Sequence, residues 1–211
     1  MDRDEVWRTI DQQRGDLADL FGTFTAADWE TQSLCTDWRV RDVAAHLTLA
    51  QSGLIEVLPA AVRAGGSFNR MIRDTAIRQA QRPVEEYAEL LRGMQGSRRT
   101  APFVSDIEPM LDSFVHEQDM LRPLGRHRPI PAEAAATAAQ RAWSLNFPFR
   151  TRKPLKGFHL VATDHPWEVG EGLTVEAPAG DLLLLVTGRD AVLPDLGGPG
   201  AEALRERLAV A

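Results

Sequence analysis

Apolar side chains recur every three or four residues in four stretches of the first 150 residues, and this helical period constrains the fold more than any other feature. The stretches run from 2 to 21, 40 to 47, 83 to 94 and 109 to 121. Proline opens the last two, at a position that the first turn of a helix tolerates. Polar connections separate the stretches, which is typical of an up-and-down four-helix bundle. A further alanine-rich helix is expected from Pro131 to about Leu145.

The period changes after Asn146, and the rest of the chain is rich in turns. Half of the 16 glycines lie in residues 151–211, which are under a third of the chain. Short apolar segments over 157–162, 167–169 and 173–175 predict strands. The run from 181 to 186 fits a buried strand or a helix, with the flanking Asp181 and Gly188 favouring a helix, and a last helix is expected over 201–208.

These patterns predict a mainly α protein with two domains. Residues 1–150 would form a helical bundle, and residues 151–211 a small α/β domain.

Composition excludes several classes of protein. A net charge of -6, with no dense run of Lys and Arg, gives no electrostatic footprint for nucleic acid. The single cysteine, Cys35, excludes an internal disulfide and a multi-cysteine metal site. Because the longest apolar run, Leu182 to Val186, is far too short to span a membrane and no secretory signal follows Met1, we expect a cytoplasmic protein that does not bind membranes.

The segment from residue 112 to 119 holds the most informative polar side chains. On a helix, Asp112, His116 and Asp119 fall on one stripe that borders the apolar face. His46 likewise flanks the buried side of its own helix. Two helices of a bundle would then direct ligands inward, and His46, Asp112 and His116 would leave one position open, as in catalytic zinc sites.

Each of these residues also has a purely structural interpretation. A histidine beside an apolar face, as at His46, is often a satisfied core residue, and Asp112 with His116 also fits an ion pair on a helix surface. Cys35 precedes a helix start, a position that suits a reactive thiol, but it also fits a buried inert thiol. Arg189 either ends a helix favourably or binds a substrate carboxylate.

Three segments together resemble the mycothiol-dependent maleylpyruvate isomerase family, within the wider DinB/YfiT-like group of metalloenzymes. Residues 35–47 are similar to the family signature Trp-x-Val-Arg-Asp-x-x-x-His-Leu. Residues 112–125 carry His-Glu-Gln-Asp and Arg-Pro-Leu-Gly. Residues 162–170, followed by 182–189, resemble the small C-terminal domain, so the resemblance runs in order through most of the chain.

The resemblance implies a DinB-like four-helix bundle followed by a small α/β domain. It also implies a divalent metal, usually zinc, held by His46, Asp112 and His116, with mycothiol as the cosubstrate. Arg189, at the family's Gly-Arg pair, would anchor a substrate carboxylate. Asp119 would orient His116 from behind.

The sequence departs from the family at two positions. Asp112 stands where the family commonly has Glu, and its shorter arm would either draw the helix closer or weaken ligation. Arg39 stands where Ser or Thr often caps a helix, which leaves that role to Asp37.

Three functions are consistent with these residues. The first is a metal-dependent enzyme that uses mycothiol, as an S-transferase or a cis-trans isomerase, on a small electrophile. The second is a metal-assisted hydrolase with Glu117 or Asp119 as general base. The third is a non-catalytic binding or regulatory protein with a vestigial metal site. Loops near 60–82 and 146–156 would contribute the walls that select the substrate.

Overall fold

The chain divides into two compact units in a computed structural model. The N-terminal unit comprises Asp2–Arg128, and the C-terminal unit comprises Pro129–Ala211 together with Met1. The structure describes all residues except 52–64, 66, 101–103, 147, 148, 210 and 211.

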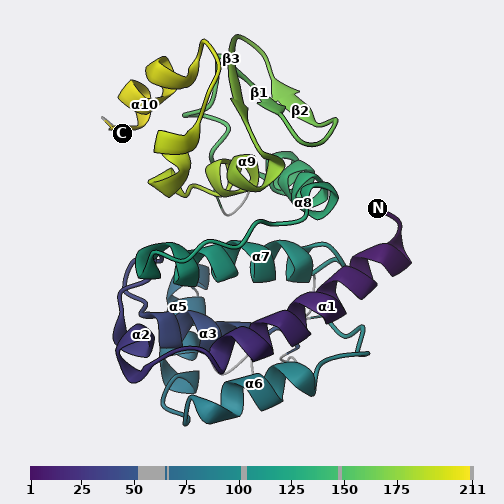
Figure 1. Ribbon diagram of the computed structural model, residues 1–211, viewed down its shortest axis with the longest axis vertical. Helices are drawn as coiled ribbons and strands as arrows, with labels where there is room; N and C mark the ends of the chain where they lie inside the picture. The colour runs from purple at the N-terminus through teal and green to yellow at the C-terminus, as the bar shows by residue number, and fades with distance from the viewer. Residues whose placement is uncertain (52–64, 66, 101–103, 147–148, 210–211) are drawn as a thin grey trace. The chain divides into compact units, whose positions relative to one another are not determined.

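The N-terminal unit is a bundle of helices. Its described helices are α1 (Arg3–Phe21), α2 (Ala26–Glu30), α3 (Val40–Leu47), α5 (Phe68–Gln79), α6 (Glu85–Arg92) and α7 (Glu108–Leu121). Figure 1 shows α6 and α7 on either side of α1, and α3 packs against both α5 and α7. The predicted helical bundle is confirmed, with helices in all four of the stretches where the period indicated them.

The core of this unit joins α3 to α1, α6 and α7. Val40 and Val43 of α3 are fully buried in one apolar cluster with Leu17, Tyr87 and Met120. Burying each aliphatic side chain of this size contributes roughly 1.5–3 kcal/mol relative to leaving it exposed. The packing therefore fixes the face of α3 that meets α7, and with it the direction of His46.

The start of α3 is capped differently from the prediction. The expected cap Asp37 is exposed and lies in a left-handed turn at φ 67°, so it does not reach the helix. Asp42, in the first turn, instead accepts the backbone N–H of Arg39 at 2.8 Å and also binds the Arg39 guanidinium. Arg39 therefore begins the helix through its own backbone and its pairing with Asp42, and the assignment of the cap to Asp37 is wrong.

The segment expected as a loop over 60–82 holds the helix α5. Ser67 accepts the backbone N–H of Arg70 at 3.4 Å and caps it, while Ala76 and Ala80 are fully buried toward the core. Because alanine side chains are small and only weakly apolar, the helical spacing of apolar residues in the sequence did not reveal this helix. Residues 60–64 and 66 of that predicted loop lie outside the described residues.

The C-terminal unit combines helices with a small sheet. Its elements are α8 (Ala132–Leu145), β1 (Phe158–Ala162), β2 (Glu168–Gly170), β3 (Leu173–Ala177), α9 (Ala179–Val186), the 3₁₀ helix η2 (Asp190–Asp195) and α10 (Ala201–Ala209). The strand order is β2-β1-β3, with β1 antiparallel to β2 and parallel to β3. The predicted small α/β part is confirmed, and the ambiguous run over 181–186 is helical.

The alanine-rich helix α8 belongs to this second unit, whereas the sequence placed it in the bundle. Its buried alanines allow the leucine-rich α9 to approach closely, and α8 packs extensively on α9. The two compact units consequently divide after Arg128 and not at residue 150.

Glycine is required at the turn between β2 and β3. Gly172 has φ +125°, and a Cβ there would lie 2.0 Å from the carbonyl oxygen of Gly157. A side chain at this position would therefore break the approach of the turn to β1.

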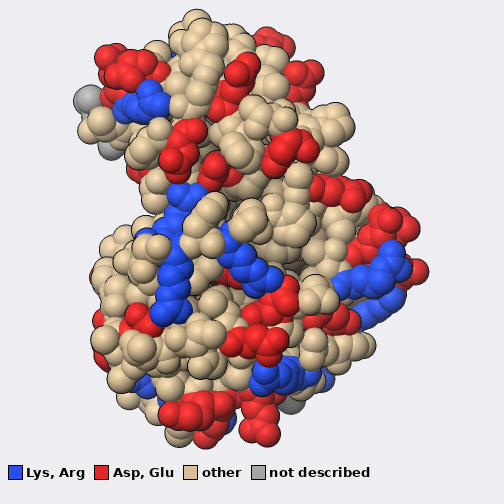
Figure 2. All heavy atoms as spheres, in the orientation of Figure 1, with Lys and Arg blue, Asp and Glu red and all other residues tan. Residues whose placement is uncertain are grey.

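The surface carries charges of both signs. Figure 2 shows acidic and basic side chains intermixed over the visible face. Among the described helices, none combines the length and the apolar character needed to cross a bilayer.

Candidate metal centre

The loop that precedes α3 is fastened to α7 by backbone hydrogen bonds. Leu34 donates its N–H to the carbonyl oxygen of Asp119 at 3.0 Å. Ser33 donates its N–H to the Trp38 carbonyl oxygen at 3.0 Å and its hydroxyl to the same atom at 2.7 Å, which closes the loop on itself. As a result, Cys35 and Trp38 lie against the polar stripe of α7.

Three candidate metal ligands converge between α3 and α7. His46 stands in the last turn of α3, and its Nε2 lies 3.3 Å from Oδ2 of Asp112. His116 stands one turn after Asp112 on α7, and its Nε2 lies 3.3 Å from the other oxygen, Oδ1. The Asp112 carboxylate therefore faces the Nε2 atoms of both imidazoles, with one oxygen toward each.

The charges in this cluster stabilise one another. Burial alone would raise the pKa of Asp112, but the charges and hydrogen bonds of His116 and His46 outweigh it and hold that pKa far below the usual range. Burial lowers the pKa of His116, but Asp112, Asp119 and Cys35 together raise it well above its ordinary value. Without a metal, Asp112 is thus an anion beside an imidazolium.

Asp119 determines which nitrogen of His116 faces Asp112. It is completely buried, and its Oδ2 lies 2.8 Å from Nδ1 of His116. The thiol of Cys35 donates to the same oxygen at 3.1 Å, and its sulfur lies 3.7 Å from the imidazole Nδ1. Because Nδ1 is bound on this side, Nε2 is the nitrogen that faces Asp112 and His46.

Trp38 packs against both imidazoles. Its ring centroid lies 5.1 Å from that of His46 and 5.9 Å from that of His116, and the two imidazoles meet edge-on at 5.0 Å. Sequence reasoning did not assign Trp38 to the site. The sequence feature that could have placed Trp38 in the site is its position at the start of the Trp-x-Val-Arg-Asp segment, eight residues before His46.

The donor set fits a divalent transition metal. Two imidazole nitrogens and a carboxylate oxygen are ligands that zinc accepts, and the ligand atoms of His46, Asp112 and His116 lie within 4.8 Å of one another. Ligand atoms around a tetrahedral ion at about 2.0–2.1 Å lie roughly 3.3 Å apart, and each imidazole Nε2 lies 3.3 Å from an oxygen of Asp112. The Asp112 side chain thus reaches both imidazoles from its own helix, despite being one methylene shorter than Glu.

Cys35, His116 and Asp119 form a second group within the same limit, on the other ring nitrogen. Its atoms are already joined by the hydrogen bonds described above. These bonds favour a supporting role over ligation for that group.

The structure separates Glu117 from the cluster. Glu117 is 1% exposed. Gln13 of α1 donates to its Oε2 at 3.0 Å, and Nη1 of Arg128, which follows α7 in the chain, lies 2.8 Å from its Oε1. Burial raises the pKa of Glu117 in spite of these partners. The carboxylate is therefore engaged in a buried ion pair and is not directed at the candidate ligands.

Arg189 lies in the C-terminal unit, after the end of α9. Its Nη1 donates to the carbonyl oxygen of Thr187 at 2.7 Å, and Gly188 before it has φ +82°, as expected for a residue that ends a helix. Its role toward a substrate stays a prediction.

The fold and the cluster define a class of protein: a helical bundle that gathers two histidines and a carboxylate from facing helices, joined to a small α/β unit. Residues 10–106 match the family described as the mycothiol maleylpyruvate isomerase N-terminal domain. This match confirms the resemblance seen in the sequence. The family is named for an enzyme.

Solved structures agree with this assignment at the level of the fold. A crystal structure of the mycothiol-dependent maleylpyruvate isomerase aligns with a TM-score of 0.60 at 11% identity, covering 90% of this chain and 91% of that one. A histidine-to-alanine mutant of that enzyme aligns with a TM-score of 0.58 at the same identity and coverage. No curated protein matches the chain.

Proposed function

We propose that the chain is a metal-dependent enzyme that uses mycothiol to isomerise a small electrophile of the maleylpyruvate type, or to transfer the thiol to it. The observation that carries this proposal is the convergence of His46, Asp112 and His116 in a domain of the maleylpyruvate isomerase family. We assign it to the cytoplasm, where such thiols stay reduced.

His46, Asp112 and His116 would hold the metal, and their donor atoms favour zinc. When bound, the metal would accept the sulfur of the thiol and lower its pKa. Asp119 holds His116 in one orientation, with Nε2 toward the shared carboxylate, and would favour the tautomer whose Nε2 is free to bind the metal. Trp38 packs against both imidazoles and limits their rotation.

The sulfur need not come from the protein. Cys35 is engaged with Asp119 behind His116, on the side of the imidazole away from Asp112. Addition of the thiol to a cis double bond forms a C–S bond and leaves a single bond that rotates. Loss of the thiol then restores the double bond in the trans form and returns the thiol unchanged.

Arg189 would bind a carboxylate of the substrate, since its guanidinium suits a bidentate pair with that group. A hydrolase that uses Glu117 as base has less support, because Glu117 is held by Arg128 and Gln13.

The test is turnover of maleylpyruvate by purified zinc-loaded protein, with and without mycothiol. We expect trans product only when the thiol is present, and loss of activity by a factor of a hundred or more in His116→Ala, by removal of a metal ligand. Asp19→Asn, at an exposed carboxylate of α1, serves as the control. Equal turnover without any thiol, or an active His116→Ala variant, would refute the proposal.

A further inference from the structure

A pocket opens in the N-terminal unit beside Asp112. Its walls are mainly apolar, and its polar lining includes one cation. The lining includes Ile10, Leu17, Leu47 and Leu91, together with the polar side chains of Arg14 and Asp112. The free space inside is about 20 Å³, which suits the charged end of a small ligand whose short apolar part lies along the open, apolar walls.

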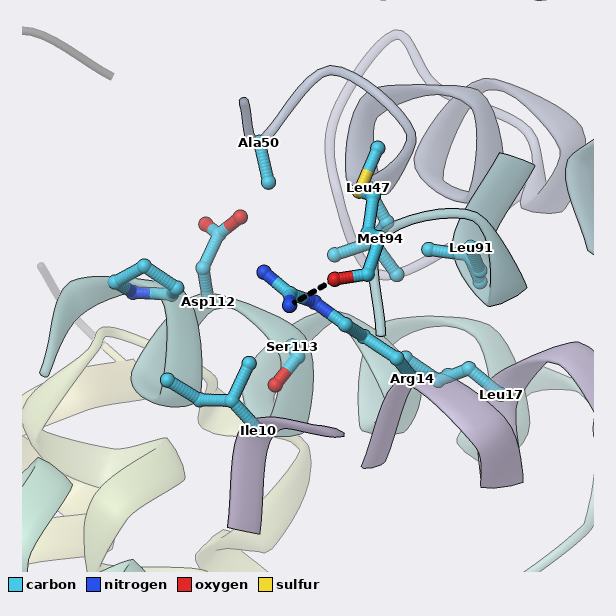
Figure 3. Close-up of a pocket in the computed structure, with 10 residues that line it drawn as sticks. Ile10, Arg14, Leu17, Leu47, Ala50, Leu91, Met94, Asp112 and Ser113 are labelled. Carbon is cyan, nitrogen blue, oxygen red and sulfur yellow. Dashed lines mark hydrogen bonds between the residues drawn. The ribbon is translucent and has the colours of Figure 1, made fainter. Parts of the chain in front are cut away.

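Arg14 lies at the centre of this pocket and is 4% exposed. Figure 3 shows its guanidinium between Asp112 and Met94, with the hydrogen bond to the Met94 carbonyl marked. Arg14 extends from α1, whereas Asp112 belongs to α7, so the pocket lies between these two helices.

Among the described residues, the hydrogen-bond partners of the Arg14 guanidinium all bind one of its nitrogens, Nη1. Nη1 donates to the carbonyl oxygens of Met94 at 2.6 Å and Ser97 at 3.0 Å, and to Oδ1 of Asp11 at 3.0 Å. Toward the described residues, neither Nη2 nor Nε donates a hydrogen bond. Within the described part of the chain, Arg14 thus joins α1 to the residues that follow α6 through its Nη1 atom.

The charge at this position is costly unless a partner offsets it. Burial lowers the pKa of Arg14, yet an arginine side chain stays protonated in a protein. Its carboxylate neighbour Asp11 is about one third exposed and binds Nη1 only. A buried guanidinium with N–H groups to spare is a residue suited to receive an anion.

We propose that Arg14 binds a carboxylate group of a small, otherwise apolar ligand in this pocket, through the N–H groups of Nη2 and Nε. The inference rests on the proposed function, because the ligand would be the electrophile that reacts beside Asp112. It adds a specificity-determining residue from α1 inside the bundle, separate from Arg189 of the C-terminal unit.

The test compares butyrate with butyramide, which has nearly the same shape without the charge. Binding to the full chain is followed by NMR titration, with and without added zinc. Wild type is expected to bind butyrate at least tenfold more tightly than butyramide, the factor that charge-assisted hydrogen bonds provide. Arg14→Gln should lose this preference. Arg92→Gln, at an exposed arginine of α6 paired with Asp19, should keep it.

Arg14→Lys is a second variant, which keeps the test informative if Arg14→Gln does not fold. It keeps the charge but lacks the paired N–H groups, so the preference should fall severalfold. No preference in wild type, or an undiminished preference in folded Arg14→Gln or Arg14→Lys, would overturn the assignment. Because the titration without zinc measures the anion alone, loss of metal binding would overturn the proposed function and leave the test of Arg14 intact.

Discussion

The Nδ1 of His116 lies 2.8 Å from a buried oxygen of Asp119, while the Nε2 of the same ring lies 3.3 Å from Asp112. The imidazole is therefore held between two carboxylates one turn or less away on its own helix. The buried carboxylate of Asp119 fixes the His116 ring. The carboxylate of Asp112 contacts both this ring and the ring of His46. Such an arrangement keeps a candidate ligand oriented before any metal arrives.

Replacing Asp119 tests this orientation. In Asp119→Asn the amide can present its N–H₂ group to the ring, so His116 loses its preference for the tautomer with Nε2 unprotonated. We expect zinc affinity to fall by about 10- to 100-fold, as for other partners behind metal-binding histidines. Competition with a fluorescent chelator measures it, and Asp19→Asn is the exposed control. Unchanged affinity in a folded variant would show that Asp119 does not orient His116.

The thiol of Cys35 offers a second test, because it donates to Asp119 and is not required as a nucleophile. Cys35→Ser keeps a donor, so thiol-dependent turnover should stay within about threefold of wild type. Cys35→Ala leaves Asp119 with one partner fewer and should cost about 1 kcal/mol of stability. Urea denaturation and initial rates measure the two effects. Complete loss of turnover in Cys35→Ser would identify Cys35 as a reacting group.

Trp38 should hold the imidazoles of His46 and His116 in place by packing against them and not by hydrogen bonding. Its indole Nε1 is buried and makes no hydrogen bond within the described part of the chain. Trp38→Phe therefore loses contact area only, whereas Trp38→Ala should destabilise the protein by about 3–5 kcal/mol and also weaken zinc binding. Thermal unfolding with and without zinc measures both. Equal destabilisation by Phe and Ala would contradict a packing role.

The helical period located most of the candidate site, because it fixes which residues of one helix share a face. Asp112 and His116 stand one turn apart on α7, and His46 borders the buried side of α3, so their meeting follows once the two helices pack. The period could not reveal Trp38 or Cys35, since their positions depend on the loop that Leu34 fastens to α7.

Other features depend on long-range packing that local patterns do not contain. The alanine-rich α8 is clear as a helix, but nothing in its own sequence shows that its partner is α9. Arg14 reads as a surface charge on α1, and only the tertiary structure buries it against the carbonyl groups of Met94 and Ser97. Asp37 lost the role of cap because Asp42 satisfies the backbone of Arg39 from inside the helix.

The buried carboxyl group of Glu117 should make the stability of the folded protein depend on pH. Because burial raises its pKa above the ordinary 4.5, the folded protein binds this proton more tightly than the unfolded chain does. Wild type should then gain stability relative to Glu117→Gln as the pH falls from 7 through the raised pKa to about 4.5. Urea denaturation at several pH values measures the difference.

The same variant separates a structural role from a catalytic one. Glu117→Gln should bind zinc as wild type does and retain thiol-dependent turnover, since Glu117 faces Arg128 and Gln13. A folded variant without activity would restore Glu117 as a general base.

The proposed function depends on His46, Asp112 and His116 holding one divalent metal. Its most direct test is zinc titration of purified, metal-stripped protein by calorimetry, beside Asp112→Asn and His46→Ala and the control Asp19→Asn. We expect one zinc per chain in wild type and in the control, with affinity at least a hundredfold lower in both site variants. Stoichiometric zinc binding that both site variants retain, or no zinc binding by the wild type, would contradict it.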